Sequence, residues 1–175
     1  MPRRRVLAGL SAAVAAGLAG CGSTPGDATP EEPTFDRLDV TSVHIDDRLE
    51  LAIPEAVPTV DARTNAALLV FPGDATVDVE QVADWLADEK ILGLLGPTAE
   101  STWIDWAESE AVNEHFDTEG TSDADPDPQL VVTAAVGLSL PTFRTTWGDE
   151  PVDRDVLEAL DDALRDISDR RASDQ

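Results

Sequence analysis

Three short apolar runs, separated by helical patterns, constrain the fold of this chain more than any other feature. They span residues 66–71, 91–95 and 130–136 and are almost entirely aliphatic, with Phe71 closing the first. Strands that are buried on both faces give such runs, whereas half-buried strands alternate apolar and polar residues. Strands that alternate with helices typically form a parallel sheet covered on its faces. We therefore expect an α/β domain, a small three-layer sandwich with a mostly parallel sheet.

Helical patterns follow the first two runs, and another closes the chain. Asp78 is a typical N-cap residue with Gln81 three positions later, which predicts that the first helix begins there. A second helix is expected to start near Thr98. The final helix is expected over residues 153–167, where apolar residues recur at helical spacing.

Two further strands are expected before the first apolar run, over residues 39–45 and 48–53. In the second of them, apolar residues at alternate positions are typical of a half-buried strand. Within the second helix, Trp103 is expected to be buried and Trp106 to be partly exposed. With Trp85 or Trp147 these rings form either an aromatic platform at the surface or, as we favour, part of the core.

The first 20 residues resemble an export signal, with a basic start, an apolar middle and small residues at the end. The apolar middle, residues 6–19, is shorter than the about 20 apolar residues that span a bilayer. The residues that resemble the twin-arginine export motif are Arg3, Arg4, Val6 and Leu7. That pathway carries folded proteins, so the resemblance implies folding before export.

Residues 18–21, Leu-Ala-Gly-Cys, are similar to a lipobox. The resemblance implies that Cys21 carries lipid on its sulfur, begins the mature chain and anchors it to the outer face of the cell membrane. A two-chain lipid of the kind implied holds a protein stably, whereas a single chain does not. Cys21 is the only cysteine, which excludes an internal disulfide and a cysteine-based metal site. A plain secretory signal or a short membrane anchor is the alternative interpretation.

Composition divides the chain into four parts. Residues 1–20 are the expected export signal, and residues 21–34, rich in Gly, Pro, Thr and acids, are expected to form a disordered, flexible tether. Residues 35–171 are long enough for a single α/β domain with its own core. Residues 172–175 are expected to be a disordered tail.

The charge of the chain indicates the solvent in which it works. There are 36 acidic and 12 basic residues, and loss of Arg3, Arg4 and Arg5 with the signal leaves a net charge of −27. Such a chain repels itself in dilute salt, but at 1 M salt the screening length falls to about 3 Å. The composition resembles that of proteins from extremely salt-loving archaea; an acidic ligand for a basic partner and a calcium sink are the alternatives. Nucleic-acid binding is not expected, because no basic patch is present.

The carboxyl ends of the strands mark the place where α/β sheets bind ligands. We expect the ends of all three apolar runs to lie on one edge of the sheet. The residues of this possible ligand edge are Gly73, Asp74, Gly96, Thr98 and Ser139. Gly96 and Thr98 open the second helix, whose free N–H groups either accept an anion or, as we favour, belong to a plain turn and cap.

The same region is similar in layout to class I glutamine amidotransferase-like domains. The similarity covers residues 69–96: an apolar run that ends in Pro72-Gly73, a helix with Trp85, and a second run that ends in Gly96. In that family the second strand leads into a turn with a nucleophilic cysteine, where this chain has Leu95. The resemblance therefore implies the fold, flavodoxin-like or amidotransferase-like, without the chemistry.

No catalytic set stands out in the sequence. Ser139 lies in a Gly-x-Ser-x-Pro stretch that departs from the nucleophile elbow at its last residue, and no histidine follows it. Aspartates alternate over residues 123–127 as in a calcium loop, but the central glycine is missing. His44 and His115 lack neighbours at metal-ligand spacing. We expect no catalytic residue, no metal and no cofactor.

These features predict a membrane-anchored surface lipoprotein that acts as a non-catalytic accessory or interaction module in a high-salt environment. Its expected partners are the membrane, through Cys21, and a protein of a surface complex. One alternative is a lipoprotein that binds a small solute at the strand edge. The other is an enzyme that uses carboxylates such as Asp74 or Glu100.

Overall fold

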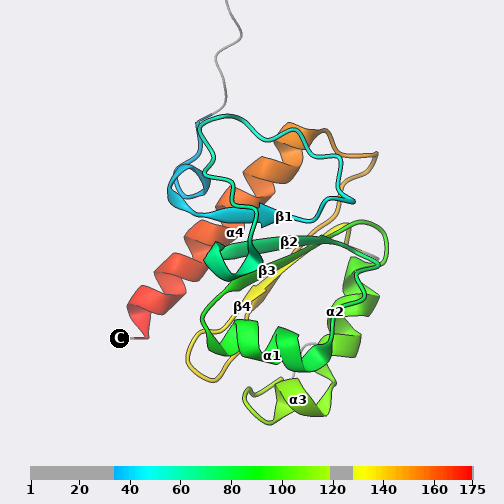
Figure 1. Cartoon of the computed structure of the whole chain (residues 1–175), viewed down its shortest axis with the longest axis vertical. Coiled ribbons are helices and arrows are strands. Elements are labelled where there is room, and N and C mark those ends of the chain that lie inside the picture. Colours follow the sequence, from blue (N-terminus) through cyan, green and yellow to red (C-terminus); the bar gives the residue numbers. More distant parts are fainter. Residues whose placement is uncertain (1–33, 119–127, 175) are drawn as a thin grey trace, which may run out of the picture. The chain divides into compact units, whose positions relative to one another are not determined.

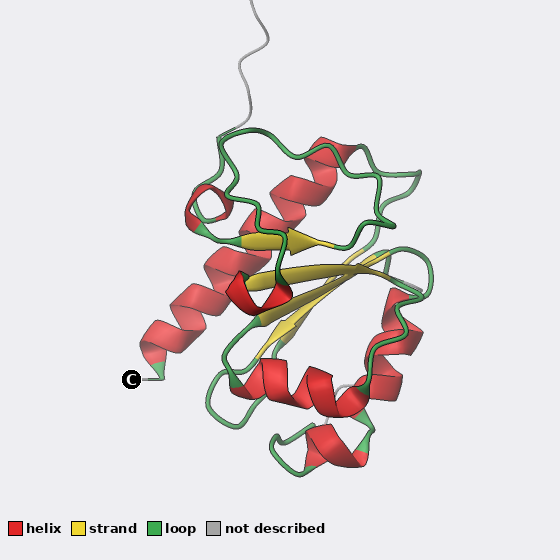
Figure 2. Cartoon of the chain, in the orientation of Figure 1, coloured by secondary structure: helices red, strands yellow, loops and turns green. Residues whose placement is uncertain are grey.

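The computed structural model describes residues 34–118 and 128–174, which form an α/β domain (Figures 1 and 2). Its centre is one five-stranded sheet. The strands are β1 (Val43–Ile45), β2 (Leu68–Pro72), β3 (Ile91–Leu95), β4 (Leu130–Ala134) and β5 (Thr142–Thr145), and they lie side by side in this order. Strands β1, β2 and β3 are parallel, and the sequence predicts this for β2 and β3.

Helices cover both faces of the sheet, which confirms the three-layer arrangement (Figure 1). The α-helices are α1 (Val79–Ala87), α2 (Ala99–Ala107), α3 (Glu110–Asn113) and α4 (Asp153–Ser173), and the short 3-10 helices are η1 (Leu38–Val40) and η2 (Arg63–Asn65). Helices α1, α2 and α3 pack on one face, and α4 packs with η1 on the other. Within the described residues, no helix is long and apolar enough to cross a membrane.

Alternate side chains of the central strands enter two separate cores. Leu69 and Phe71 of β2 belong to the core under α1 and α2, whereas Leu68 and Val70 belong to the core under α4. All four side chains are fully buried. The continuous apolar pattern of this strand therefore reflects burial on both faces, as predicted.

Helix α1 begins where the sequence predicts. The Asp78 side chain accepts a hydrogen bond from the backbone N–H of Glu80, so it caps the first turn. The helix then buries Val82, Trp85 and Leu86 against the sheet. This cap fixes the point at which the chain turns back after β2.

Strand β4 runs opposite to β3, which corrects the prediction that all three apolar runs are parallel. Leu95, at the end of β3, is paired with Leu130, at the start of β4. The chain therefore re-enters the sheet at the edge where β3 leaves it. An apolar run reports burial of a strand but not its direction, so the pattern could not distinguish the two cases.

Strand β5 was not expected from the sequence, and it pairs antiparallel with β4. The two strands form a hairpin whose last bridge joins Val136 to Ser139, so Gly137 and Leu138 make its two-residue turn. Gly137 has a φ of +59°, which favours glycine at the first turn position. The sequence does contain a signal for this hairpin, namely a glycine between two β-forming stretches.

The segments before β2 differ from the prediction at two places. Residues 39–45 do not form one strand, because η1 occupies Leu38–Val40 and β1 begins only at Val43. Residues 48–53 are irregular rather than a strand. Their alternating apolar side chains pack against the core under α4, but no strand pairs with them. The alternation therefore correctly indicated burial on one side but not a strand.

The end of the chain and the order of the sheet also differ from the prediction. Helix α4 continues to Ser173, so residues 172 and 173 are helical rather than part of a disordered tail. The sequential order β1 to β5 is not the flavodoxin-like order, in which the first two strands are exchanged.

Residues 32–175 form one compact unit. Every buried residue of the two cores lies between Phe35 and Ile167. A fragment that begins at Glu32 therefore contains everything that the described fold needs, and we expect it to fold without the preceding residues.

Candidate functional site

The carboxyl ends of β2 and β3 bring four of the predicted ligand-edge residues together. Gly73 and Asp74 follow β2, and Gly96 and Thr98 follow β3. The Gly73 N–H donates to the Leu95 carbonyl at 2.7 Å, which joins the two turns. A Cβ at Gly73 would lie 2.8 Å from the Ala99 nitrogen, so this close approach requires glycine.

Backbone hydrogen bonds of the protein itself hold the turn that leads into α2. The Gly96 N–H donates to the Gln129 carbonyl at 2.7 Å, and the Ala99 N–H donates to the Gly96 carbonyl at 3.1 Å. Thr102 adds a hydroxyl hydrogen bond to the Gly73 carbonyl. These contacts build the turn that joins β3 to α2.

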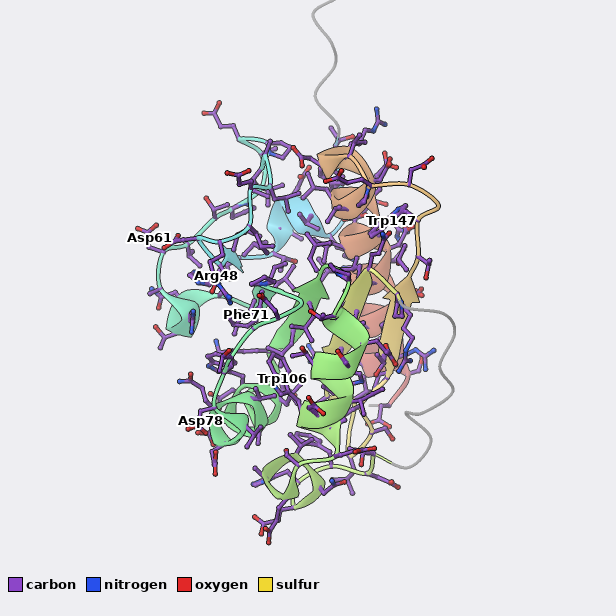
Figure 3. The ribbon with its side chains drawn as sticks, turned by 90° about the vertical axis from the view of Figure 1, so that its right-hand side faces the viewer. Arg48, Asp61, Phe71, Asp78, Trp106 and Trp147 are labelled. Carbon is purple, nitrogen blue, oxygen red and sulfur yellow. The ribbon has the colours of Figure 1, made fainter. Side chains whose placement is uncertain are left out.

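Four charged side chains form a network at the ends of β1 and β2. Arg48 bonds Asp46 at 3.1 Å and Asp74 at 3.3 Å, and Arg63 bonds the second oxygen of Asp46 at 3.2 Å. The Arg63 guanidinium also lies 5.1 Å from the centre of the Phe71 ring. Arg48 and Phe71 are both labelled in Figure 3. The network ties the loop after β1 to the turn after β2.

The network lowers the pKa of Asp46 below its ordinary value. Burial is the largest single influence and acts to raise the pKa, because it disfavours the charged form. Hydrogen bonds from the Arg48 backbone and side chain, with the charges of Arg48 and Arg63, together outweigh it. Asp46 is therefore held as a carboxylate between two cations.

A groove of about 340 Å³ opens beside this edge, on the face covered by α4. Its apolar wall includes Leu49, Leu51, Leu95, Pro97 and Val156, and its backbone includes Gly96. Three carboxylates, those of Glu50, Glu150 and Asp153, also line it. We refer to this hollow as the strand-end groove. Its position is the one at which α/β sheets commonly bind ligands.

The described residues form three further hollows, one of which shares Leu51 with the strand-end groove. One, of about 470 Å³, is lined by Val136 and the end of α4, including Asp166 and Asp169. Another, of about 500 Å³, lies beside β1 and includes Asp47 and Asp61. The third, of about 340 Å³, lies between η1 and α4. We favour the strand-end groove for solute binding because of its apolar wall and its position.

Ser139 lies at the opposite edge of the sheet, which corrects its placement at the ligand edge. Because β4 is antiparallel to β3, its last residue, Ala134, is paired with Ile91 at the start of β3. Ser139 closes the hairpin turn and bridges Asp117. The structure therefore separates Ser139 from Gly73 and Gly96.

The remaining chemical candidates are engaged in structural contacts. Glu100 is buried, and both its oxygens accept from the Arg144 Nε, at 3.0 and 2.9 Å. His44 and His115 each place Nδ1 within hydrogen-bonding distance of a backbone carbonyl, that of Val60 or Ala111. No cluster of His, Cys, Asp or Glu among the described residues is arranged to hold a metal ion.

The tryptophans of α1 and α2 belong to the core. Trp103 is fully buried, as predicted, but Trp106 is only 4% exposed, which corrects the expectation of partial exposure. The Trp106 ring meets Phe71 edge to face at a centroid distance of 6.5 Å, and both residues are labelled in Figure 3. Trp85 stacks on the other side of this cluster, 5.5 Å from Phe71. No surface platform forms from these three indoles, because all three are buried in the core under α1 and α2.

Asp161 is a structural site that the sequence did not reveal. It lies on the buried face of α4 and accepts hydrogen bonds from the backbone N–H groups of Asp36, Arg37 and Leu38. Arg165 bonds it at 2.9 Å. The only signal was an acid within an apolar stripe, and in so acidic a chain that signal is weak.

Several predicted features lie outside the described residues. They are the export motif, Cys21, the tether to residue 33, the alternating aspartates of 123–127 and Gln175.

No protein-family model matches this sequence, and it has no match among curated proteins or solved structures. The class of protein therefore rests on the sequence features and the geometry given above. The geometry defines an α/β domain with a strand-end groove.

Proposed function

We propose that this chain is an exported lipoprotein, anchored to the outer face of the cell membrane by lipid on Cys21. Its domain acts as a non-catalytic accessory or interaction module in a high-salt environment. The observation that carries the anchor is a Leu-Ala-Gly-Cys sequence that contains the only cysteine and directly follows an export-like segment. Acidic composition supports the high-salt environment.

The charged network at the strand edge supports a module that acts by binding. Asp46 and Asp74 are held by Arg48, and Glu100 is held by Arg144. A general acid or base needs a carboxylate that is free to exchange a proton with a substrate. These carboxylates instead hold loops and helices in place, so the carboxylate enzyme is the weaker alternative.

Affinity purification of the tagged full-length protein from native membranes, kept in molar salt, tests this function. We expect a stoichiometric protein partner to be recovered, and the same partner to be lost when Cys21→Ser releases the chain from the membrane. A reproducible hydrolase or transferase activity that disappears after a strand-end substitution such as Asp74→Asn would contradict the non-catalytic module.

A second candidate function is small-solute binding in the strand-end groove. Its apolar wall and its three carboxylates suit a small organic cation with an apolar body. Glu50 and Glu150 are exposed at the rim, and one oxygen of Asp153 accepts from the Ala52 N–H at 3.2 Å. The ligand would therefore meet carboxylates at the rim and aliphatic side chains deeper in.

A thermal-shift screen in molar salt tests this candidate with organic cations and their neutral isosteres. We expect cations alone to raise the melting temperature, and Glu50→Gln and Glu150→Gln to reduce the shift. Glu55→Gln, an exposed acid outside the groove lining, is the matched control. Equal shifts with neutral isosteres would exclude charge recognition.

We also propose that one part of the domain, formed by β2, α1, β3 and α2, is related in fold to amidotransferase-like domains. These elements follow one another as strand, helix, strand and helix, and Leu95 closes the second strand. The antiparallel β4 and β5 depart from a continuous parallel sheet. Any such kinship would extend to the architecture of this unit and not to its chemistry.

A further inference from the structure

The hollow between η1 and the C-terminal half of α4, the η1–α4 groove, differs from the other three in its charge. The strand-end groove and the hollows beside β1 and Val136 all include carboxylates. The lining of the η1–α4 groove includes none, although the chain has 36 acids. Two arginines, Arg37 and Arg171, line it instead, and the Arg171 guanidinium donates to the Ala135 and Glu89 carbonyls.

Arg37 differs from the other cationic residues of the described chain in the contacts of its side chain. Across 34–118 and 128–174, every other arginine and Lys90 has an ion pair, a hydrogen bond or a ring contact through its side chain, whereas Arg37 has none. Its backbone N–H is bonded to Asp161, so its position is fixed while its guanidinium is available. The chain has three acidic residues for each basic one, so an arginine without an acidic partner indicates a binding site for an external anion.

Apolar groups complete the η1–α4 groove. Leu164, Ile167 and Ile91 form a buried floor, and Val40 stands at the rim with 75% of its surface exposed. A phosphate beside an apolar body is the chemistry of a phospholipid at the headgroup boundary, where cations and apolar side chains are favoured together. Guanidinium groups bind phosphate through paired hydrogen bonds.

The place of the groove in the chain indicates which surface it meets. Arg37 lies three residues after Thr34, and residues 22–34 separate it from Cys21. From its composition, we expect this segment to hold the domain about 20 Å from its anchor. We propose that the η1–α4 groove docks the domain on the membrane by binding the headgroup of an anionic phospholipid. This inference rests on the proposed membrane anchor for its location.

The salt concentration controls whether the domain can dock on an anionic membrane. In dilute salt the net charge of the domain opposes approach to an anionic membrane. At 1 M salt the screening length of about 3 Å removes this long-range repulsion but leaves direct contacts between guanidinium and phosphate. Docking is therefore expected to strengthen from dilute to molar salt, the reverse of the behaviour of a polybasic segment.

Vesicle flotation of the fragment 32–175 tests the proposal without the lipid anchor. In molar salt we expect the fragment to float with phosphatidylglycerol vesicles and not with phosphatidylcholine vesicles. Arg37→Gln should reduce the bound fraction about fivefold, and Val40→Asp should reduce it as well. The matched controls, Arg154→Gln in an exposed pair with Glu158 and Val152→Asp at another exposed valine, should leave binding unchanged.

Equal flotation with both vesicles, no flotation, or full binding after Arg37→Gln would overturn the proposal. Binding of glycerol phosphate as tight as that of vesicles would assign the groove to a free anion instead. Because the fragment lacks Cys21, failure here contradicts the docking groove alone. An unlipidated Cys21 in the full chain would contradict the anchor alone.

Discussion

Asp161 holds the start of the domain against its last helix. Its two oxygens accept from three consecutive backbone N–H groups at distances of 2.7 to 3.3 Å, and Arg165 balances its charge. Hydrogen bonds to a charged group contribute more than neutral ones. This carboxylate therefore sets the position of η1, and with it one wall of the η1–α4 groove.

Asp161→Ala should lower the free energy of unfolding by about 3 kcal/mol, since it leaves three backbone N–H groups, that of Leu38 fully buried, without an acceptor. The neighbouring Asp162→Ala removes an exposed carboxylate that also pairs with Arg165, and should cost less than about 1 kcal/mol. Denaturant unfolding in molar salt measures both. Equal losses in the two variants would contradict the role of Asp161.

The pKa of Asp46 gives a pH-dependent contribution to stability. Its folded-state pKa lies below the ordinary value of 3.8, so the contribution is present above that value and is lost as pH falls through the folded-state pKa. Wild type should therefore lose more stability than Asp46→Asn between neutral pH and about pH 3. Parallel losses, measured by denaturant unfolding at each pH, would show that the arginines do not stabilise the carboxylate.

Residue patterns predicted part of the candidate site and missed the rest for a physical reason. Gly73 and Gly96 were placed correctly, because each directly follows a strand of the parallel part of the sheet. Ser139 was misplaced because an apolar run carries no information on strand direction. The pairing of Arg48 with Asp46 and Asp74 depends on how far side chains reach across loops, which spacing in the sequence does not encode.

At the scale of elements, local signals predicted β2, α1 and β3 closely. A cap at Asp78 and two-sided burial of the strands are local properties of the chain. The direction of β4 is set by its pairing with β3 and β5 in the folded sheet, which a local apolar pattern does not report. Strand β5 is short and includes Arg144, so it lacked a strong apolar pattern.

The pair of Glu100 and Arg144 joins α2 to the edge strand β5. Glu100→Gln should lower the free energy of unfolding by about 2 kcal/mol, because it weakens a charged hydrogen bond in a largely buried place. Glu158→Gln, in an exposed pair with Arg154, should cost about 0.5 kcal/mol or less. Similar costs for the two variants in denaturant unfolding would contradict a clamp between α2 and β5.

At the scale of the whole molecule, excess negative charge is the dominant property. With 36 acids, mutual repulsion opposes the compact state until salt screens it. We expect the fragment 32–175 to lose its fold below some hundreds of millimolar salt, and to regain it when salt is restored. Melting curves followed by circular dichroism across salt concentrations measure this dependence. The same melting temperature in dilute buffer and in molar salt would contradict adaptation to high salt.

The proposed location, partners and membrane docking of the protein all depend on lipid attachment at Cys21. Its most direct test is the intact mass of the protein purified from the membranes of a host that processes lipoproteins. We expect a chain that begins at Cys21 and carries a two-chain lipid, and a Cys21→Ser protein that leaves the membrane fraction. A chain whose N-terminus lies elsewhere, or an unmodified Cys21, would contradict this attachment.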